Sequence, residues 1–380
     1  MNFIENYQQL KGIFNLNQDE IKIPESELRI INQEFHSSAI VPAAITGHVE
    51  DLQIKENVHF RYPVIMPDGK KKAARVIILL HGLNERSWHK HLTGARMLSE
   101  RTGRAVLMFP LSYHINRGLP EWTDNRKMAG LLEARKRNFS HIQEASVVNL
   151  ALSERLTEYP QRFYFSGLQS IKDLISLLRQ IKKGDHPLFE NGTSTDIFAY
   201  SISCMLVQAL MISNPEGILD KSKIVFFAGG SLFSGMKGVS KYIMDSLAFK
   251  TILRFYTDAV TKKSGFLNQL QSGGIERSFG DAFRSLIIPG LYAREREKAM
   301  AGFSKNLMVI AMQNDRIMPV EGIREATGEH FFRSGQFKLV HFPYDYTHEN
   351  PFPVLYNKIN QQVENAFMSV YKPALEFYSR

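Results

Sequence analysis

The sequence predicts an α/β protein whose central sheet is mostly parallel and is flanked by helices. Residues 75–80 and 105–109 are continuous apolar runs of strand length, which is typical of strands buried on both faces. Between them, residues 88–102 have helical character and end at Gly103. A strand, a helix and a second strand in this order favour a right-handed crossover between parallel neighbours.

The same alternation continues along the chain. Residues 168–181 carry apolar side chains at helical spacing, and Gly184 follows as a stop signal. Because another apolar run comes next, this helix is expected to lead into a further strand of the sheet. Strands are expected over 195–200, 224–228, 306–313 and 337–342, with a last helical stretch behind them.

The N-terminal part of the sequence is less regular. Residues 1–45 show mixed patterns without a clear core strand, which predicts an extension packed on the body of the protein. Residues 51–55 and 58–65 alternate between polar and apolar side chains. This alternation predicts two antiparallel strands at one end of the sheet.

Two insertions interrupt the pattern. The region 231–303 is too long for one helix, and we expect short helices that form a lid, with the core domain over 46–230 and 304–380. A helical decoration without a gating role is the alternative. The second insertion, 110–163, begins at the carboxyl end of a strand. The glycines that interrupt the first insertion are Gly235, Gly238, Gly265, Gly273 and Gly274.

The expected strand over 195–200 stops abruptly at Ser201. Its neighbours two positions away, Ala199 and Ser203, are small, and helical character follows at once. A strand that turns sharply into a helix strains the turn residue and leaves room only for small side chains at those positions. Ser201 is therefore the candidate nucleophile. Ser203 is a weaker candidate because its outer neighbour Met205 is large, and a plain buried serine at a strand end is the alternative to both.

A glycine turn follows the apolar run over 75–80. His81, Gly82, Leu83 and Asn84 stand at the carboxyl end of that strand, where a turn frees backbone N–H groups to face a ligand. The amides of Leu83 and Ile202 are the candidates for an oxyanion hole, with Asn84 next. The alternative is an ordinary strand-ending turn with a structural histidine.

An acid and a histidine follow the last two expected strands. Asp315 comes directly after residues 306–313, and His348 lies on the loop after residues 337–342. Both therefore belong at the same sheet edge as Ser201. Asp345, three residues before His348, competes with Asp315, which we prefer because it follows its own buried strand.

The order Ser201, Asp315, His348 and the strand that precedes each residue give the sequence a family resemblance. Over roughly residues 47–375 the chain resembles the α/β-hydrolase superfamily, although Ala and Ser stand where that family commonly has two glycines. The motifs that carry the resemblance are His81-Gly82, Ala199-Tyr-Ser201-Ile-Ser203, Asn314-Asp315 with Pro319, and Thr347-His348.

The resemblance implies a serine hydrolase that cleaves an ester or a related acyl bond without a cofactor. Ser201 would attack the carbonyl carbon, His348 would take its proton and give it to the leaving group, and Asp315 would orient His348. An acyltransferase or thioesterase using the same triad is one alternative. A non-catalytic binding protein with this fold is the other.

Several residues near strand ends are candidates for lining the substrate pocket, and each is equally compatible with a structural role. Arg117 has the further property that its guanidinium can meet a carboxylate or phosphate. The candidates are His81, Asn84, Tyr113, His114, Arg117, Trp122 and Tyr200.

Composition narrows the function further. The net charge is +9, but the basic residues fall in scattered clusters without zinc spacing, a helix-turn-helix pattern or interleaved aromatics, which argues against nucleic acid. No metal-binding spacing is present, and the single cysteine, Cys204, excludes an internal disulfide. Without a signal-peptide pattern or a membrane-length apolar run, we expect a cytoplasmic protein that acts on a small acyl or ester substrate. The sequence does not indicate an oligomeric state.

Overall fold

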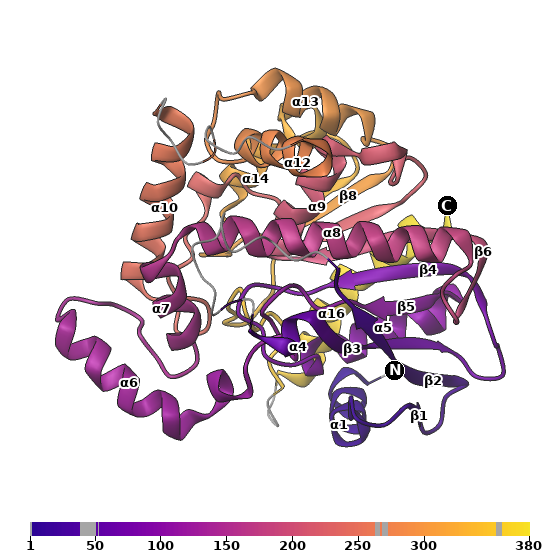
Figure 1. Cartoon of the computed structure of the whole chain (residues 1–380). Coiled ribbons are helices and arrows are strands. Elements are labelled where there is room, and N and C mark those ends of the chain that lie inside the picture. The colour runs from indigo at the N-terminus through magenta and orange to yellow at the C-terminus, as the bar shows by residue number, and fades with distance from the viewer. Residues whose placement is uncertain (1, 39–50, 52, 263–266, 268–272, 355–358) are drawn as a thin grey trace.

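The computed structural model describes residues 2–38, 51, 53–262, 267, 273–354 and 359–380. Within these residues, nine strands form one sheet in the order β1-β2-β3-β5-β4-β6-β7-β8-β9 (Figure 1). The strands are β1 (Glu20–Lys22), β2 (Leu28–His36), β3 (His59–Pro67), β4 (Ala73–Leu80), β5 (Ala105–Met108), β6 (Phe189–Tyr200), β7 (Ile224–Phe227), β8 (Leu307–Met312) and β9 (Phe337–Val340).

The sheet is parallel from β5 to β9 and antiparallel at its other end. Strands β5, β4, β6, β7, β8 and β9 pair in parallel, whereas β3, β2 and β1 add antiparallel neighbours beyond β5. Each parallel strand except β9 is buried along most of its length. The predicted mostly parallel sheet is confirmed.

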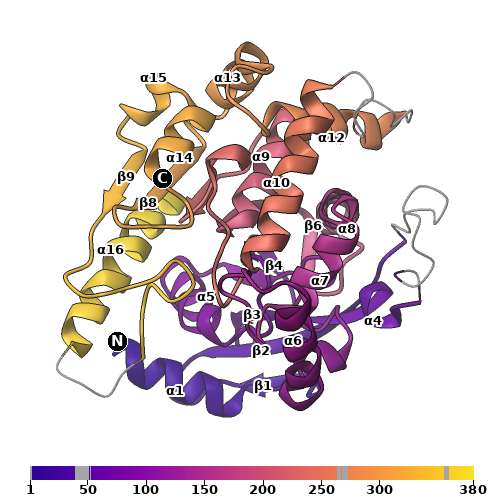
Figure 2. The same ribbon diagram turned by 90° about the vertical axis from the view of Figure 1, so that its left-hand side faces the viewer.

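Helices cover both faces of the sheet. In β4, Val76 and Ile78 pack into the core on one face, and Ile77 and Leu79 into the core on the other, as the period of two requires. Figure 2 views the sheet from its carboxyl edge, with α8 on one side and α5 and α16 on the other. The covering helices are α8 (Gln161–Lys183) and α9 (Ile202–Ser213) on the first face, and α1 (Phe3–Ile13), α5 (His89–Thr102) and α16 (Asn360–Ser379) on the second.

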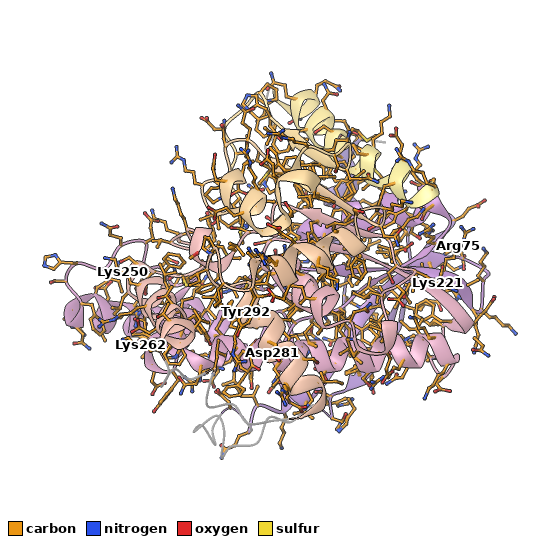
Figure 3. The ribbon with its side chains drawn as sticks, turned by 90° about the horizontal axis from the view of Figure 1, so that it is seen from above. Arg75, Lys221, Lys250, Lys262, Asp281 and Tyr292 are labelled. Carbon is orange, nitrogen blue, oxygen red and sulfur yellow. The ribbon has the colours of Figure 1, made fainter. Side chains whose placement is uncertain are left out.

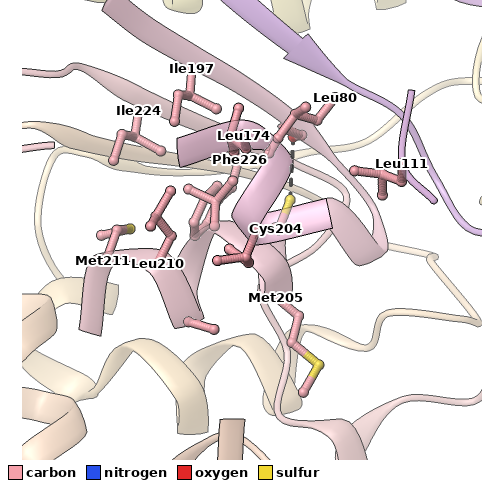
Figure 4. Close-up of a cluster of buried hydrophobic side chains, with 14 of the residues drawn as sticks. Leu80, Leu111, Leu174, Ile197, Cys204, Met205, Leu210, Met211, Ile224 and Phe226 are labelled. Carbon is pink, nitrogen blue, oxygen red and sulfur yellow. Dashed lines mark hydrogen bonds between the residues drawn. The ribbon is translucent and has the colours of Figure 1, made fainter. Parts of the chain in front are cut away.

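The packing between α9 and the sheet is the part of the core that supports Ser201. Cys204, Met205, Leu210 and Met211 of α9 lie close to apolar side chains of β6, β7 and α8 (Figure 4). Cys204 is fully buried and burial raises the pKa of its thiol well above the usual value, so it belongs to the core.

The two insertions form the outer helices. Helices α7 and α10 pack against each other at the carboxyl edge of the sheet (Figure 2), and α12 packs on α8 and α9 over one sheet face. Gly265 and its neighbours 263–266 and 268–272 lie outside the described residues. The helices are α6 (Asn125–Asn138) and α7 (Leu150–Glu158) in the first insertion, and α10 (Ser246–Thr261), α12 (Gly274–Ser285) and α13 (Ala293–Gly302) in the second.

The prediction for the N-terminal region was wrong in two respects. Residues 1–45 hold a core strand, β2, which pairs with β3 along its whole length. Of residues 51–55, the described ones (51 and 53–55) form no strand, and α4 (Lys55–Val58) precedes β3 instead. The buried positions of β2 include the amide Asn32, and the charged or amide residues Arg29, Gln33 and Glu34 lie among them, so the strand was hidden in a mixed pattern. Residues 39–45 lie outside the described residues.

Exposed basic residues are spread over the molecule. Figure 3 places Arg75 and Lys221 at one end, and Lys250 of α10 and Lys262, which follows this helix, at the other. The positive net charge is therefore distributed between distant elements.

Gly94 fixes the distance between α5 and α16, which gives a stability prediction. A methyl group at Gly94 would lie 2.0 Å from the Tyr371 hydroxyl oxygen, and Tyr371 is held by stacking on Phe198. Gly94→Ala is expected to lower the unfolding free energy by about 1–3 kcal/mol through overpacking. Gly130→Ala on α6, where no atom lies within 4 Å, is the control and should leave stability equal or slightly higher. Equal melting temperatures for the two variants would contradict the packing.

Candidate active site

Ser201 occupies a strained turn between β6 and α9. Its backbone has φ 61° and ψ −125°, a combination that non-glycine residues rarely adopt. The turn is held because the Ser201 N–H donates to the Phe227 carbonyl at 3.0 Å and the Cys204 N–H donates to the Ser201 carbonyl at 3.0 Å. Gly229 is needed beside it, since a β-carbon there would lie 2.3 Å from the Ser201 carbonyl oxygen.

The buried side chain of Ser203 also stabilises the turn. Its hydroxyl oxygen accepts the Tyr200 N–H at 2.9 Å and lies 2.8 Å from the Tyr200 carbonyl. The residue is fully buried, so its hydroxyl serves the backbone of the turn. A serine at this position therefore adds hydrogen bonds that a glycine would lack.

The structure brings Ser201, His348 and Asp315 together from three loops. Ser201 Oγ lies 2.6 Å from His348 Nε2, and His348 Nδ1 lies 2.7 Å from Asp315 Oδ2. The other carboxylate oxygen of Asp315 accepts the N–H groups of Ile317 and Met318, each at 2.9 Å. Asp315 thus fixes the imidazole with Nδ1 protonated, which leaves Nε2 free to accept a proton from the serine.

The competing acid has a different place. Asp345 is exposed to solvent on the same loop as His348, and it lines a broad groove. Asp315 is 6% exposed. Of the two carboxylates, Asp315 is the one bonded to the imidazole.

Two backbone amides lie beside the serine. Ile202 is the first residue of α9, so its N–H has no partner within the helix. Leu83 follows Gly82, where a β-carbon would lie only 3.2 Å from the Ser201 β-carbon, so glycine allows the close approach of this turn. Within the described residues the Leu83 N–H has no hydrogen-bond partner.

A buried carboxylate that the sequence reasoning missed supports this turn. Glu85 accepts the Gly82 N–H at 3.0 Å and bonds His91 at 2.6 Å and Lys90 at 2.7 Å. Burial would raise the pKa of Glu85, but His91 and Lys90 more than offset it and the pKa is lowered. In the sequence, the signal for this role of Glu85 is weak: it is a glutamate three residues after a glycine in a turn.

Tyr200 holds the other side of His348. Its hydroxyl donates to the His348 carbonyl, and its ring stacks on the imidazole with centroids 5.7 Å apart. The Lys90 ammonium lies 4.3 Å from the centre of the Tyr200 ring. Tyr200 therefore positions the histidine from a buried site.

A cavity of about 200 Å³ adjoins Ser201, and residues of both insertions line it. Asn84 ties the two insertions together, because its amide nitrogen donates to the carbonyls of Val148 and Tyr242 at 3.0 and 2.7 Å. Further out, Arg135 makes a two-pronged ion pair with Asp245 at 2.8 and 3.1 Å. Ser201 itself is 3% exposed.

Two predicted pocket residues are structural in their contacts. Arg117 is fully buried, pairs with Asp173 at 2.7 Å and donates to the carbonyls of Asn57 and Pro110. His81 donates from Nδ1 to the Gly82 carbonyl at 2.8 Å and accepts the Leu111 N–H at 2.9 Å through Nε2. Neither side chain has a free polar atom to offer a ligand.

Three of the predicted pocket residues, Tyr113, His114 and Trp122, line a cavity beside the one at Ser201. Tyr113 and Trp122 both stack against the Arg155 guanidinium, at 4.9 and 4.5 Å, and line a small cavity next to Asn84. His114 borders the same cavity and a second, apolar one. None of these three lines the cavity at Ser201.

The described ranges contain no candidate metal-binding cluster and no candidate membrane-spanning helix. There, no three His, Cys, Asp or Glu side chains are grouped as metal ligands. Over the same ranges, no helix has the length and apolar character that crossing a bilayer requires.

Comparison with known proteins gives one family and several structural neighbours. Residues 1–379 match the profile of DUF6051, described as a family of unknown function, and no curated protein matches. An acetyl xylan esterase from Paenibacillus sp. R4 is 13% identical, with 98% of this chain and 93% of that chain covered and a TM-score of 0.47. Esterase LipW from Mycobacterium marinum is 11% identical, with 93% and 83% covered and a TM-score of 0.47.

An acylaminoacyl peptidase from Pyrococcus horikoshii is also similar, at 11% identity and a TM-score of 0.41. That match covers 92% of this chain but 41% of the peptidase, so this chain spans less than half of its length.

The burial of His81 predicts a dependence of stability on pH. Burial, helped by neighbouring His114, lowers the pKa of His81 from 6.5 to about 3. Between these values the unfolded chain binds a proton that the folded chain does not, so stability falls as the pH is lowered through this window, by roughly 1.4 kcal/mol per pH unit. His81→Asn keeps a donor for the Gly82 carbonyl and should show a shallower loss of unfolding free energy from pH 6.5 to 4. An unchanged slope would contradict the buried neutral imidazole.

Proposed function

This chain belongs to DUF6051, a family of unknown function, and we propose that it is a serine hydrolase that cleaves an ester through an acyl-enzyme intermediate. One observation carries the proposal: a continuous hydrogen-bonded series from Ser201 through His348 to Asp315, which starts at a strained strand-to-helix turn. No simple structural purpose requires a buried serine, imidazole and carboxylate in this order.

The proposed reaction begins with Ser201. His348 Nε2 takes the hydroxyl proton as Oγ bonds to the carbonyl carbon, and Asp315 stabilises the imidazolium that results. The developing negative charge on the carbonyl oxygen is held by the amides of Leu83 and Ile202. His348 then protonates the departing alcohol, and a water molecule, activated by the same imidazole, releases the acid and restores Ser201.

The insertions are part of the proposal. We assign residues 231–303 to a cover over the core, because Tyr242 and Ile243 line the Ser201 cavity and Asp245 anchors the segment to α6. Exclusion of water beside Ser201 strengthens hydrogen bonds to the oxyanion. In this proposal α12, which packs on α8 and α9, supports the cover through the ring contact of Phe283 with Tyr256 of α10.

Removal of the nucleophile is the direct test of the reaction. Ser201→Ala is expected to lower kcat for a small activated ester by about 10⁵- to 10⁶-fold, because the acyl-enzyme can no longer form. Its melting temperature should stay close to that of the unchanged protein, since alanine keeps the small side chain that the turn requires. Retention of turnover by a folded Ser201→Ala variant would place the chemistry elsewhere.

The two competing carboxylates can be separated by paired variants. Asp315→Asn should lower kcat about 10⁴-fold, because the amide favours the wrong imidazole tautomer. Asp345→Asn removes an exposed charge and should lower kcat less than tenfold. Equal losses in the two variants, measured with the same ester, would argue against Asp315 as the partner of His348.

A further inference from the structure

Two cavities of contrasting chemistry adjoin the Ser201 cavity. The first, about 60 Å³ in volume, is apolar and is lined by Leu83 and Ile202 together with residues of α8, α9 and α12. The second is a groove of about 1140 Å³ that has His348 and Asp315 in its wall. Leu83 is shared by the Ser201 cavity and the apolar one, whereas Tyr242, His348 and Glu349 are shared with the groove.

The apolar cavity is small. Leu206, Phe279 and Phe283 close it on one side, and Gly167 of α8 forms part of its wall. A water-sized sphere needs about 10–15 Å³, so the cavity holds on the order of four to six such spheres and fewer of the larger methyl groups. An acyl chain of about two to four carbons fits this space, and a long fatty chain does not.

The groove is large and polar, and its charges nearly balance. Three cationic side chains face four carboxylates, one of which, Asp315, is bonded to His348. Nearly equal numbers of positive and negative side chains favour an uncharged occupant over an anion or a cation. The charged residues are Lys237, Lys241 and Arg316, and Glu144, Asp315, Asp345 and Glu349.

Three tyrosines, Tyr242, Tyr344 and Tyr346, also line the groove. Tyr242 is 57% exposed, which is unusual for so large a side chain. The hydroxyls of Tyr344 and Tyr346 already bond the Pro351 carbonyl and the Asn314 N–H. Exposed rings among polar side chains suit an occupant that has both hydroxyl groups and C–H faces.

The geometry of the proposed reaction indicates which part of the substrate each cavity would bind. In the tetrahedral intermediate the leaving oxygen must lie near His348 Nε2, which gives it a proton, so the alcohol extends toward the groove. The oxyanion faces the amides of Leu83 and Ile202 in the proposed reaction. Because the apolar cavity begins at these same two residues, it receives the acyl chain.

We propose that the substrate is an ester of a short apolar acyl group and a large, uncharged, polyhydroxylated alcohol, a sugar ester in chemical class. This inference rests on the proposed function. The bond between Ser201 Oγ and the acyl carbon forms as the acyl–oxygen bond breaks, and the alcohol leaves with the proton from His348. Water then yields the short carboxylic acid and regenerates Ser201.

The acyl half is tested with a chain-length series of 4-nitrophenyl esters from acetate to octanoate. Wild type should prefer acetate and butyrate over octanoate by at least tenfold in kcat/KM. A β-carbon on Gly167 would lie 3.4 Å from Phe279 and 3.9 Å from Leu206, so Gly167→Ala fills the cavity without a clash. It should lower kcat/KM for butyrate relative to acetate about tenfold, and Leu206→Ala should shift preference toward longer chains.

Gly130→Ala makes the same helical substitution outside the cavity and is the control, with no expected change in chain-length preference. An identical chain-length profile in all four proteins would overturn the acyl assignment while leaving the proposed hydrolase intact. Absence of turnover with every ester would overturn the proposed function and this inference together.

The alcohol half is tested by comparing a monoacetylated methyl glucoside and acetylated cellotriose with ethyl acetate. At least one sugar acetate should exceed ethyl acetate about tenfold in kcat/KM, and the better of the two shows whether a single sugar or a chain fills the groove. Tyr242→Ala should lower this ratio about tenfold. Tyr292→Ala, at an exposed tyrosine outside the groove, should leave it unchanged. Equal kcat/KM for sugar acetates and ethyl acetate in the wild type would overturn the assignment of the groove.

Discussion

The left-handed backbone of Ser201 is the constraint on which the site depends. A positive φ at a serine costs of order 1–3 kcal/mol, and it persists only because neighbouring groups hold it. Those groups are the Phe227 carbonyl of the adjacent strand, the Ser203 hydroxyl inside the turn and the glycine at position 229. The same turn brings the hydroxyl to His348 and leaves the first amide of α9 without a partner within the helix.

The parallel sheet explains why distant residues meet. Ser201, Asp315 and His348 follow β6, β8 and β9, whose carboxyl ends lie at one edge because the strands run in the same direction. The loop after β4 brings Leu83 to that edge, and Glu85 holds the loop by accepting the Gly82 N–H. Helices on both faces bury the strands, so the edge is the place where polar side chains can face a ligand.

The parallel core and the Ser201, Asp315 and His348 series followed from the sequence because they depend on local signals. Buried parallel strands read as continuous apolar runs, and Ser201 and Asp315 each stand at the end of such a run, whereas His348 lies on the loop after the less buried β9. Strand β2 was missed because it is half-buried and interleaved with polar residues. The burial of Arg117 was also beyond sequence reasoning, since its partners Asn57 and Asp173 come from distant segments.

The identity of the residue that an electrophile modifies tests the central claim most directly. The folded protein would be treated with an organophosphonate that mimics the tetrahedral intermediate, digested, and the modified peptide sequenced by mass spectrometry. The account predicts a single adduct on Ser201, which Ser201→Ala abolishes and which forms more slowly in His348→Ala. A folded protein that gives no adduct, or an adduct on another residue such as Ser203, would contradict the claim that Ser201 is an activated nucleophile.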